Sequence, residues 1–184
     1  MNPIIPILLV FGGVLAWSAF KTAKAVVNLK YTMLGFGIYR VSSDGVALRL
    51  KVRFTNAQKT PLTVNLIDLA AYLNSSTSYD SNGNLVVNNR GDLLASYADS
   101  AGFLIAANGF TEKQFIFTIR WADLGRVLLG NAAAIINAIR NLEGMNSIVS
   151  SIIGHNILIY GIVKAENVSV DICNIIPLID ERYN

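Results

Sequence analysis

The feature that most constrains the fold is a strict two-residue alternation over residues 46–54. Charged side chains separate the apolar ones at Arg49, Lys51 and Arg53. Because successive side chains of a strand point to opposite faces, this pattern predicts a half-buried antiparallel strand. The side chains predicted to face the core are Val46, Leu48, Leu50, Val52 and Phe54.

A corner follows this strand and leads into a second apolar segment. Asn56 is placed to bond the backbone of the corner through its side chain, and Pro61 fixes the entry into a strand over 62–73. Further strands are expected at 32–40, in a pair over 93–106, at 110–121 and in a closing hairpin over 156–172. Turns are expected at 42–45 and 106–109, and the Ser- and Asn-rich stretch 75–92 is expected to form a long exposed hairpin or loop. The order predicts a mainly β chain folded as an antiparallel two-sheet β-sandwich.

A helical insertion is predicted at about 122–153, where the apolar period changes from two to helical and Asp123 can cap the start. We expect this insertion to pack across the open end of the sandwich. The apolar residues at 132–136 extend past a single stripe, so the alternative is an interface for a neighbouring protein or a membrane. The residues of that candidate interface are Leu128, Ile135, Ile136 and Ile139.

The first twenty residues carry no charged side chain, and about twenty apolar residues suffice to span a bilayer. A signal peptide would require basic residues before the apolar run, and none precedes it here. The basic residues follow the run instead, at Lys21, Lys24 and Lys30. We expect a retained transmembrane helix; a signal peptide and a buried core helix are the alternatives. The predicted anchor residues are Ile4, Leu8, Val10, Phe11, Val14, Leu15, Trp17 and Phe20.

The predicted organisation is an anchor and stalk at 1–31, a sandwich at 32–173 and a C-terminal tail at 174–184. The formal net charge is only +3, and the basic residues are scattered rather than gathered into a stripe, so a nucleic-acid partner is not expected. The single cysteine, Cys173, excludes an intrachain disulfide and is interpreted as a small buried hydrophobe.

The stretch 54–64 resembles the strand-corner signature of the late-embryogenesis-abundant (LEA) type 2 family, also described as the water-stress-and-hypersensitive-response domain. The matching residues are Asn56, Pro61, Leu62 and Val64, whereas Ala57 and Gln58 depart from the family pattern of Asn-Pro-Asn. Stretches resembling the family's other turns, including 106–109, follow in the expected order across 32–173. The resemblance implies an immunoglobulin- or fibronectin-III-like sandwich of about seven strands. It also implies no cofactor, no enzymatic activity, and a membrane-tethered protein linked to desiccation or stress, with phage-borne relatives.

Catalytic side chains are sparse. His155 is the only histidine, which leaves no partners for a histidine-based triad or a multi-histidine metal site. Asp80, Asn82 and Asn84 have the spacing of a calcium loop, but the glycine and the closing glutamate of such a loop are missing. The glycines at 35–37 are interpreted as a bulge or a close backbone approach rather than as a nucleotide fingerprint. Asp68 and Asp171 are the two carboxylates that could meet in space, and only a structure can show whether they do.

Three functions remain open. The first is a non-enzymatic, single-pass tethering protein in a cell envelope or a virion membrane, with the lipid bilayer, other proteins of an assembly or a second copy of itself as partners. The second is a cellular protein that protects against water loss. The third is a sandwich that binds a small ligand or a lipid in a cavity between its sheets, which would need more than about 300 Å³.

Overall fold

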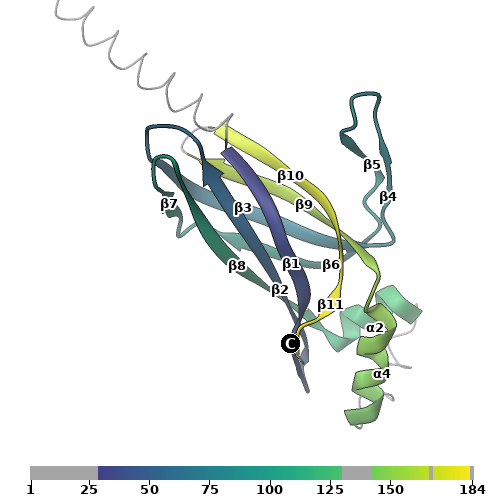
Figure 1. Cartoon of the computed structure of the whole chain (residues 1–184). Coiled ribbons are helices and arrows are strands. Elements are labelled where there is room, and N and C mark those ends of the chain that lie inside the picture. Colours follow the sequence, from purple (N-terminus) through teal and green to yellow (C-terminus); the bar gives the residue numbers. More distant parts are fainter. Residues whose placement is uncertain (1–28, 130–141, 166–167, 183–184) are drawn as a thin grey trace, which may run out of the picture.

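The computed structural model describes residues 29–129, 142–165 and 168–182, and it is mainly β, with antiparallel sheets and few helices (Figure 1). Two sheets face one another, a small hairpin projects from the side, and two helices lie at one end. The strands are β1 (Leu29–Ser42), β2 (Gly45–Asn56), β3 (Leu62–Leu73), β4 (Ser76–Tyr79), β5 (Leu85–Asn89), β6 (Asp92–Asp99), β7 (Phe103–Ile105), β8 (Gly109–Arg120), β9 (Asn156–Ala165), β10 (Val168–Pro177) and β11 (Ile179–Asp180).

Sheet 1 has the strand order β11-β1-β2-β8. Strand β1 pairs antiparallel with β2 from Leu29 opposite Asn56 to Ser42 opposite Gly45. Strand β2 pairs along its whole length with β8, so Asn56 also lies opposite Gly109. The starts of β1 and β8 and the end of β2 therefore lie at one end of the sandwich, which we name the corner end.

Sheet 2 has the order β10-β9-β3-β6, and β7 pairs with the first residues of β3. All of these pairs are antiparallel. The chain crosses from sheet 1 to sheet 2 at the corner after Asn56, and it crosses back between β7 and β8. Both crossings lie at the corner end.

The core lies between the two sheets. The five residues predicted to share one face of 46–54 are all fully buried, so the predicted alternation is confirmed. Aromatic rings from both sheets meet there: the Tyr97 ring of sheet 2 lies 5.2 Å from that of Phe115 and 6.0 Å from that of Phe117. Burial of these rings and of the aliphatic residues between them is the main source of stability.

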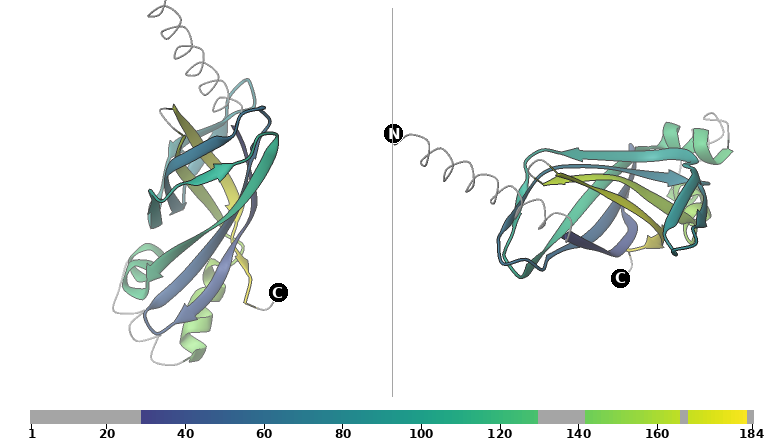
Figure 2. Two further views of the ribbon diagram at one scale, coloured as in Figure 1. Left: turned by 90° about the vertical axis from the view of Figure 1, so that its left-hand side faces the viewer. Right: turned by 90° about the horizontal axis from the view of Figure 1, so that it is seen from above.

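Helices α2 (Trp121–Leu129) and α4 (Leu142–Ile152) lie at the end opposite the corner end, which we name the helix end (Figure 2). The indole Nε1 of Trp121 donates to the Ser42 carbonyl at 2.9 Å, which fixes the start of α2 on the β1–β2 turn. Leu124, Val149 and Ile152 are buried in the core. The described helical residues therefore pack over this end of the sandwich, as expected.

The stretch 75–92 forms the hairpin β4–β5, which is exposed as predicted and stands at the side of the sandwich, its tip pointing away from α2 and α4 (Figure 1). The predicted tail at 174–184 is wrong over residues 174–180. Residues 174–177 continue β10, with Asn174 opposite Ile159, and β11 pairs in parallel with β1. A two-residue strand whose partner lies at residues 37 and 38 leaves no local pattern, so the sequence could not predict it.

Candidate functional site

The outer face of sheet 2 carries a shallow pocket of about 230 Å³. The strand alternation explains its position, since Asp68, Ala70 and Tyr72 of β3 all point away from the core. Ala70 lies opposite Tyr160 of β9, so a small residue leaves room beside an aromatic ring. The lining residues are Asp68, Ala70, Tyr72, Arg90, Tyr160, Gly161 and Ile162.

Arg90 partly closes the pocket. It follows β5, and its guanidinium carbon lies 4.2 Å from the centroid of the Tyr160 ring, which is a cation–π contact. One carboxylate, one guanidinium and two phenol rings thus share a hollow smaller than the usual small-molecule site of about 300 Å³ or more. This pocket lies on the outside of sheet 2, whereas the predicted ligand cavity was to lie between the sheets.

Asp68 and Asp171 lie on this same outer face but do not meet. Each is paired across the sheet with Ile162, from opposite sides, so one strand separates them. Two strand spacings place their backbones about 10 Å apart. Both residues are exposed to solvent, and neither faces the other across the pocket.

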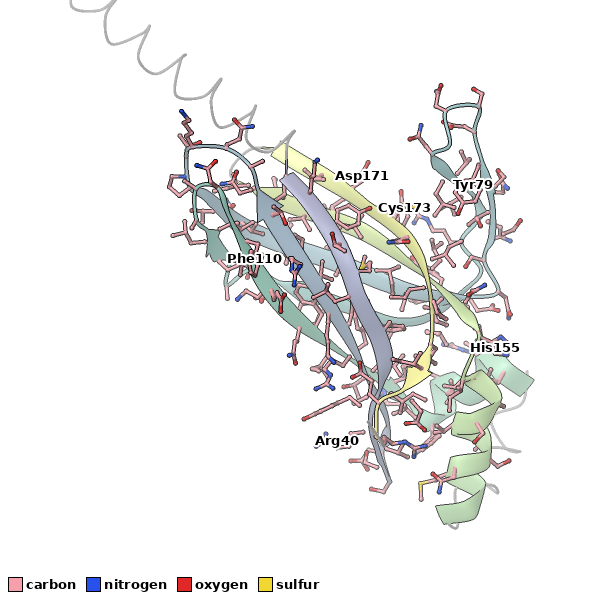
Figure 3. The ribbon with its side chains drawn as sticks, in the orientation of Figure 1. Arg40, Tyr79, Phe110, His155, Asp171 and Cys173 are labelled. Atoms are coloured by element: carbon pink, nitrogen blue, oxygen red, sulfur yellow. The ribbon has the colours of Figure 1, made fainter. Side chains whose placement is uncertain are left out.

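His155 is exposed in the turn between α4 and β9, far from Asp171 (Figure 3). Its backbone is used structurally, since its N–H donates to Ile152 and its carbonyl accepts from Leu178. In the part of the chain that the structure describes, no three His, Cys, Asp or Glu side chains converge as a metal site requires.

Cys173 lies on β10, where the hydroxyl of Tyr31 holds its backbone. That hydroxyl accepts from the Cys173 N–H at 3.1 Å and donates to the Cys173 carbonyl at 3.3 Å, so β1 of sheet 1 is joined to the edge of sheet 2. The thiol is half-buried. Burial, and secondarily the charge of Asp171, raise the pKa of the Cys173 thiol. A raised pKa disfavours the thiolate, which is the nucleophilic form.

Asp80, Asn82 and Asn84, which have the spacing of a calcium loop, lie at the tip of the β4–β5 hairpin. The carboxylate of Asp80 accepts from the backbone N–H groups of Asn82 and Asn84, each at 2.8 Å, and from the Asn84 side chain at 3.0 Å. The hydrogen bonds from Asn84 are the main cause that lowers the pKa of Asp80. The aspartate oxygens therefore organise the turn, as Asx turns do.

The four corner residues lie where β2 passes into β3. Asn56 is a fully buried polar side chain, and Leu62 and Val64 are fully buried in the core, while Pro61 is exposed just before β3 begins. The Asn56 amide donates to the carbonyls of Thr60 at 2.8 Å and Ala106 at 3.3 Å, and its oxygen accepts from the Gln58 N–H at 3.0 Å.

Of the candidate interface residues, Leu128 is half-buried against the core. Ile135, Ile136 and Ile139 lie outside the described residues, as do the predicted anchor residues in 1–20 and Lys21 and Lys24. Lys30 is exposed near the start of β1. Within residues 29–129, 142–165 and 168–182, no helix combines the length and the apolarity that crossing a bilayer requires.

One buried charge was missed by the sequence analysis. The side chain of Glu181 is only 7% exposed and bonds Arg49 at 2.6 Å and Lys51 at 3.1 Å on the outer face of sheet 1. It lies against Gly35 and Gly37, and a Cβ on Gly37 would lie 2.5 Å from Cγ of Glu181. Register shifts between Met33 and Gly35 also mark a bulge, so the glycines at 35–37 serve both purposes proposed for them. We name this arrangement the C-terminal latch.

The fold and these contacts define the class of this molecule by its architecture alone: a β-sandwich covered by helices at one end. No family model and no curated protein matches the chain.

Several solved structures resemble it at low identity. The sporulation control protein Spo0M from Bacillus subtilis is 8% identical with a TM-score of 0.40; the match covers 83% of this chain and 49% of that one, so this chain spans about half its length. A protein from Archaeoglobus fulgidus is 9% identical with a TM-score of 0.37, covering 82% of this chain and 94% of that one. A candidate LEA protein solved in solution is 11% identical with a TM-score of 0.35, covering 96% and 88% respectively.

Proposed function

We propose that this chain is a non-enzymatic tethering protein, in which an N-terminal membrane helix carries a β-sandwich that docks to neighbouring proteins. The observation that carries the proposal is the pairing of Leu29 with Asn56, which starts the sandwich directly after segment 1–28. The first twenty residues of that segment are uncharged, and lysines follow them. A rigid domain joined to an apolar segment without a long linker suits a tether.

The assignment of a non-enzymatic role rests on what the polar side chains do. Asn56 closes the corner, and Glu181 holds the C-terminal latch. The outward carboxylates Asp68 and Asp171 are separated by a strand, and His155 lies at the helix end. General acid–base catalysis needs such groups within hydrogen-bond reach of one substrate, and these groups are dispersed over different parts of the sandwich.

We assign the sandwich to the LEA type 2 family as part of the same proposal. Its support is that the two family-like turns, 56–61 and 106–109, contact each other through Asn56 and Ala106. A more specific version of the proposal places the chain in a membrane-containing virion or an envelope complex. Its support is that the chain would consist of one membrane helix and one β-domain, a simple organisation that suits a structural component.

A cellular stress-protective role is the second candidate. It is favoured by the exposed hairpin β4–β5, in which most exposed side chains of the two strands are Ser and Asn and form hydrogen bonds such as that from Asn88 to Ser78 at 3.2 Å. A polar, well-hydrated protrusion fits a protein that acts on other molecules as water is lost.

Vesicle flotation of the full chain tests the proposal. The chain is synthesised with vesicles of phosphatidylcholine and phosphatidylglycerol, and we expect it to float with them and to resist alkaline extraction. Replacing Leu8 and Val14 by Lys should abolish both, because each charge near the centre of a span costs about 3 kcal/mol. The matched control replaces two exposed sandwich residues, Thr118 and Ser96, by Lys and should float like the wild type. A wild-type chain left in the aqueous fraction would overturn the tethering role, and crosslinking in the floated fraction would identify neighbours.

A further inference from the structure

We propose that the corner end of the sandwich is a lipid-contacting surface that rests on the headgroup region of an anionic bilayer, with Leu104 and Phe110 inserted and Lys30 and Lys59 over the phosphates. The inference rests on the proposed membrane anchor and adds to it which face of the domain meets the membrane. The opposite helix end, with α2 and α4, would then point away from the bilayer (Figure 1).

Chain connectivity brings this end close to the membrane. Strand β1 begins at Leu29, which is paired with Asn56 at the corner end. Residues 21–28 separate Leu29 from the last apolar anchor residue, Phe20. That length reaches at most about 27 Å when fully extended, and about 12 Å if it is helical. The corner end is therefore the part of the described sandwich that the anchor holds nearest to the bilayer.

Two large apolar side chains protrude at this end. Leu104 of β7 is 59% exposed and Phe110 of β8 is 61% exposed, on the two sides of the turn 106–109. The two segments are in contact, since the Thr111 hydroxyl donates to the Leu104 carbonyl at 3.1 Å. On β8 the outward positions next to Phe110 are Glu112 and Gln114, so the phenylalanine interrupts a polar face. Exposed aromatic and aliphatic residues at one end fit the boundary between headgroups and acyl chains.

Basic side chains accompany these apolar ones. Lys30 and Lys59 are exposed at the same end, one on β1 and one in the corner. The guanidinium carbon of Arg53 lies 4.9 Å from the Phe110 ring centroid, and Nη2 of Arg53 bonds Glu112 at 2.6 Å, so a paired guanidinium lies against this ring. Lysines close to an anionic leaflet are attracted by its negative surface potential.

Hydrogen bonds also hold the corner end together, which keeps its lipid-facing side chains at a constant position relative to the rest of the sandwich. Besides the three hydrogen bonds of the Asn56 side chain, the Asn108 N–H donates to the Gln58 carbonyl at 2.8 Å. The corner and the turn 106–109 therefore move together. A motif whose contacts are structural thereby sets the orientation of the lipid-facing side chains.

The test uses the full chain in vesicles of phosphatidylcholine and phosphatidylglycerol with brominated acyl chains. In a Cys173→Ala background, single cysteines replace Leu104 or Phe110 and carry an environment-sensitive fluorophore. The matched controls are Leu93, 50% exposed at the helix end, and Tyr79, 72% exposed on the projecting hairpin (Figure 3). We expect quenching by the brominated lipid to be at least about twofold stronger at 104 and 110 than at 79 and 93.

The outcomes separate this inference from the proposed anchor. If the labelled chains float but positions 104 and 110 are quenched no more than 79 and 93, the lipid-contacting surface is wrong and the anchor stands. If the chains do not float, the tethering proposal itself fails and this inference fails with it. Lys59 is exposed. Lys59→Gln should reduce quenching at position 110 in vesicles with phosphatidylglycerol and leave it unchanged in phosphatidylcholine alone. An equal effect of the substitution in the two kinds of vesicle would contradict the role of Lys59.

Discussion

The side-chain amide of Asn56 donates a hydrogen bond to the carbonyl oxygen of Ala106 at 3.3 Å, which joins two turns that lie fifty residues apart in the chain. The same amide spans its own corner through Thr60 and Gln58. One buried side chain thereby joins the two crossings between the sheets that lie at the corner end. A fully buried amide is tolerated because its hydrogen-bonding groups are satisfied.

Replacing Asn56 by Ala should destabilise the sandwich by about 2–4 kcal/mol, because three hydrogen bonds are lost in a site closed to water. Urea unfolding of the detergent-solubilised chain, followed by intrinsic fluorescence, measures the loss. Asn88→Ala on the exposed hairpin is the matched control and should change stability by less than about 0.5 kcal/mol. Equal effects of the two substitutions would show that the corner bonds contribute nothing specific.

The two glycines of the C-terminal latch should respond differently to the same substitution. A Cβ at Gly37 would meet Glu181 at 2.5 Å and Ile179 at 3.0 Å, whereas a Cβ at Gly35 meets Glu181 only at 3.8 Å. Gly37→Ala should therefore cost about 1–3 kcal/mol by displacing β11, and Gly35→Ala should stay within about 0.5 kcal/mol. Thermal unfolding compares the variants, and a similar cost for both would rule out the close approach as the cause.

Glu181 should make the latch sensitive to acid. Burial alone would raise the pKa of this carboxyl, but hydrogen bonds and charge from Arg49 and Lys51 outweigh it and lower the pKa below the ordinary 4.5. The ionised form is thus favoured by folding, so its contribution is complete above pH 4.5 and is lost as the pH falls through the lowered value.

Glu181→Gln should consequently destabilise the chain by about 2 kcal/mol at neutral pH, and the difference from the wild type should shrink in acid. Chemical unfolding across the pH range measures it. Glu112→Gln, which removes an exposed pair with Arg53, is the control and should cost less than about 0.5 kcal/mol. A difference that persists unchanged in acid would mean that the charge of Glu181 does not act.

Tyr31→Phe should loosen the edge of sheet 2 by removing the hydroxyl that holds the Cys173 backbone. The expected loss is about 1 kcal/mol, with faster hydrogen exchange at the Cys173 amide. Tyr39→Phe is the control, because its ring is exposed and lies against Arg49 on sheet 1. Unchanged exchange at Cys173 in the Tyr31 variant would show that β1 does not secure this edge.

The Cys173 thiol should be alkylated by iodoacetamide more slowly than a free cysteine at mildly alkaline pH, since burial raises its pKa and limits access. Asp171→Asn should speed the reaction modestly, because it removes the second cause of the shift and leaves burial in place. Asp68→Asn, two strands away on the same face, should have no such effect. A rate as fast as that of free cysteine would contradict the half-buried environment.

The sandwich was predictable where one local pattern decided the structure. The alternation at 46–54 specified both the strand and its buried face, since a half-buried sheet selects one register. Asn56 was identifiable because an asparagine directly after an alternating strand can bond the backbone of the corner that follows. The contact of Asn56 with Ala106 depends on how the two sheets are arranged, which no local window contains.

The remaining features required the arrangement in space. Glu181 could not be placed, because its groove exists only when β11 lies beside Gly37, although the unusual glycines at 35–37 gave a signal that a backbone or side chain comes close. The pocket beside Tyr160 likewise joins β3, β9 and Arg90 from three distant segments. Such sites depend on long-range pairing and carry no periodicity of their own.

Strand β1 begins at the corner end and has its full length paired with β2, while the latch on its other side lies toward the helix end. Tension applied between a held N-terminus and a partner at the helix end would therefore run parallel to β1. The hydrogen bonds between β1 and β2 are perpendicular to that direction, so they would be loaded together in shear rather than opened one after another. A domain built in this way resists pulling along its length far better than peeling from its side.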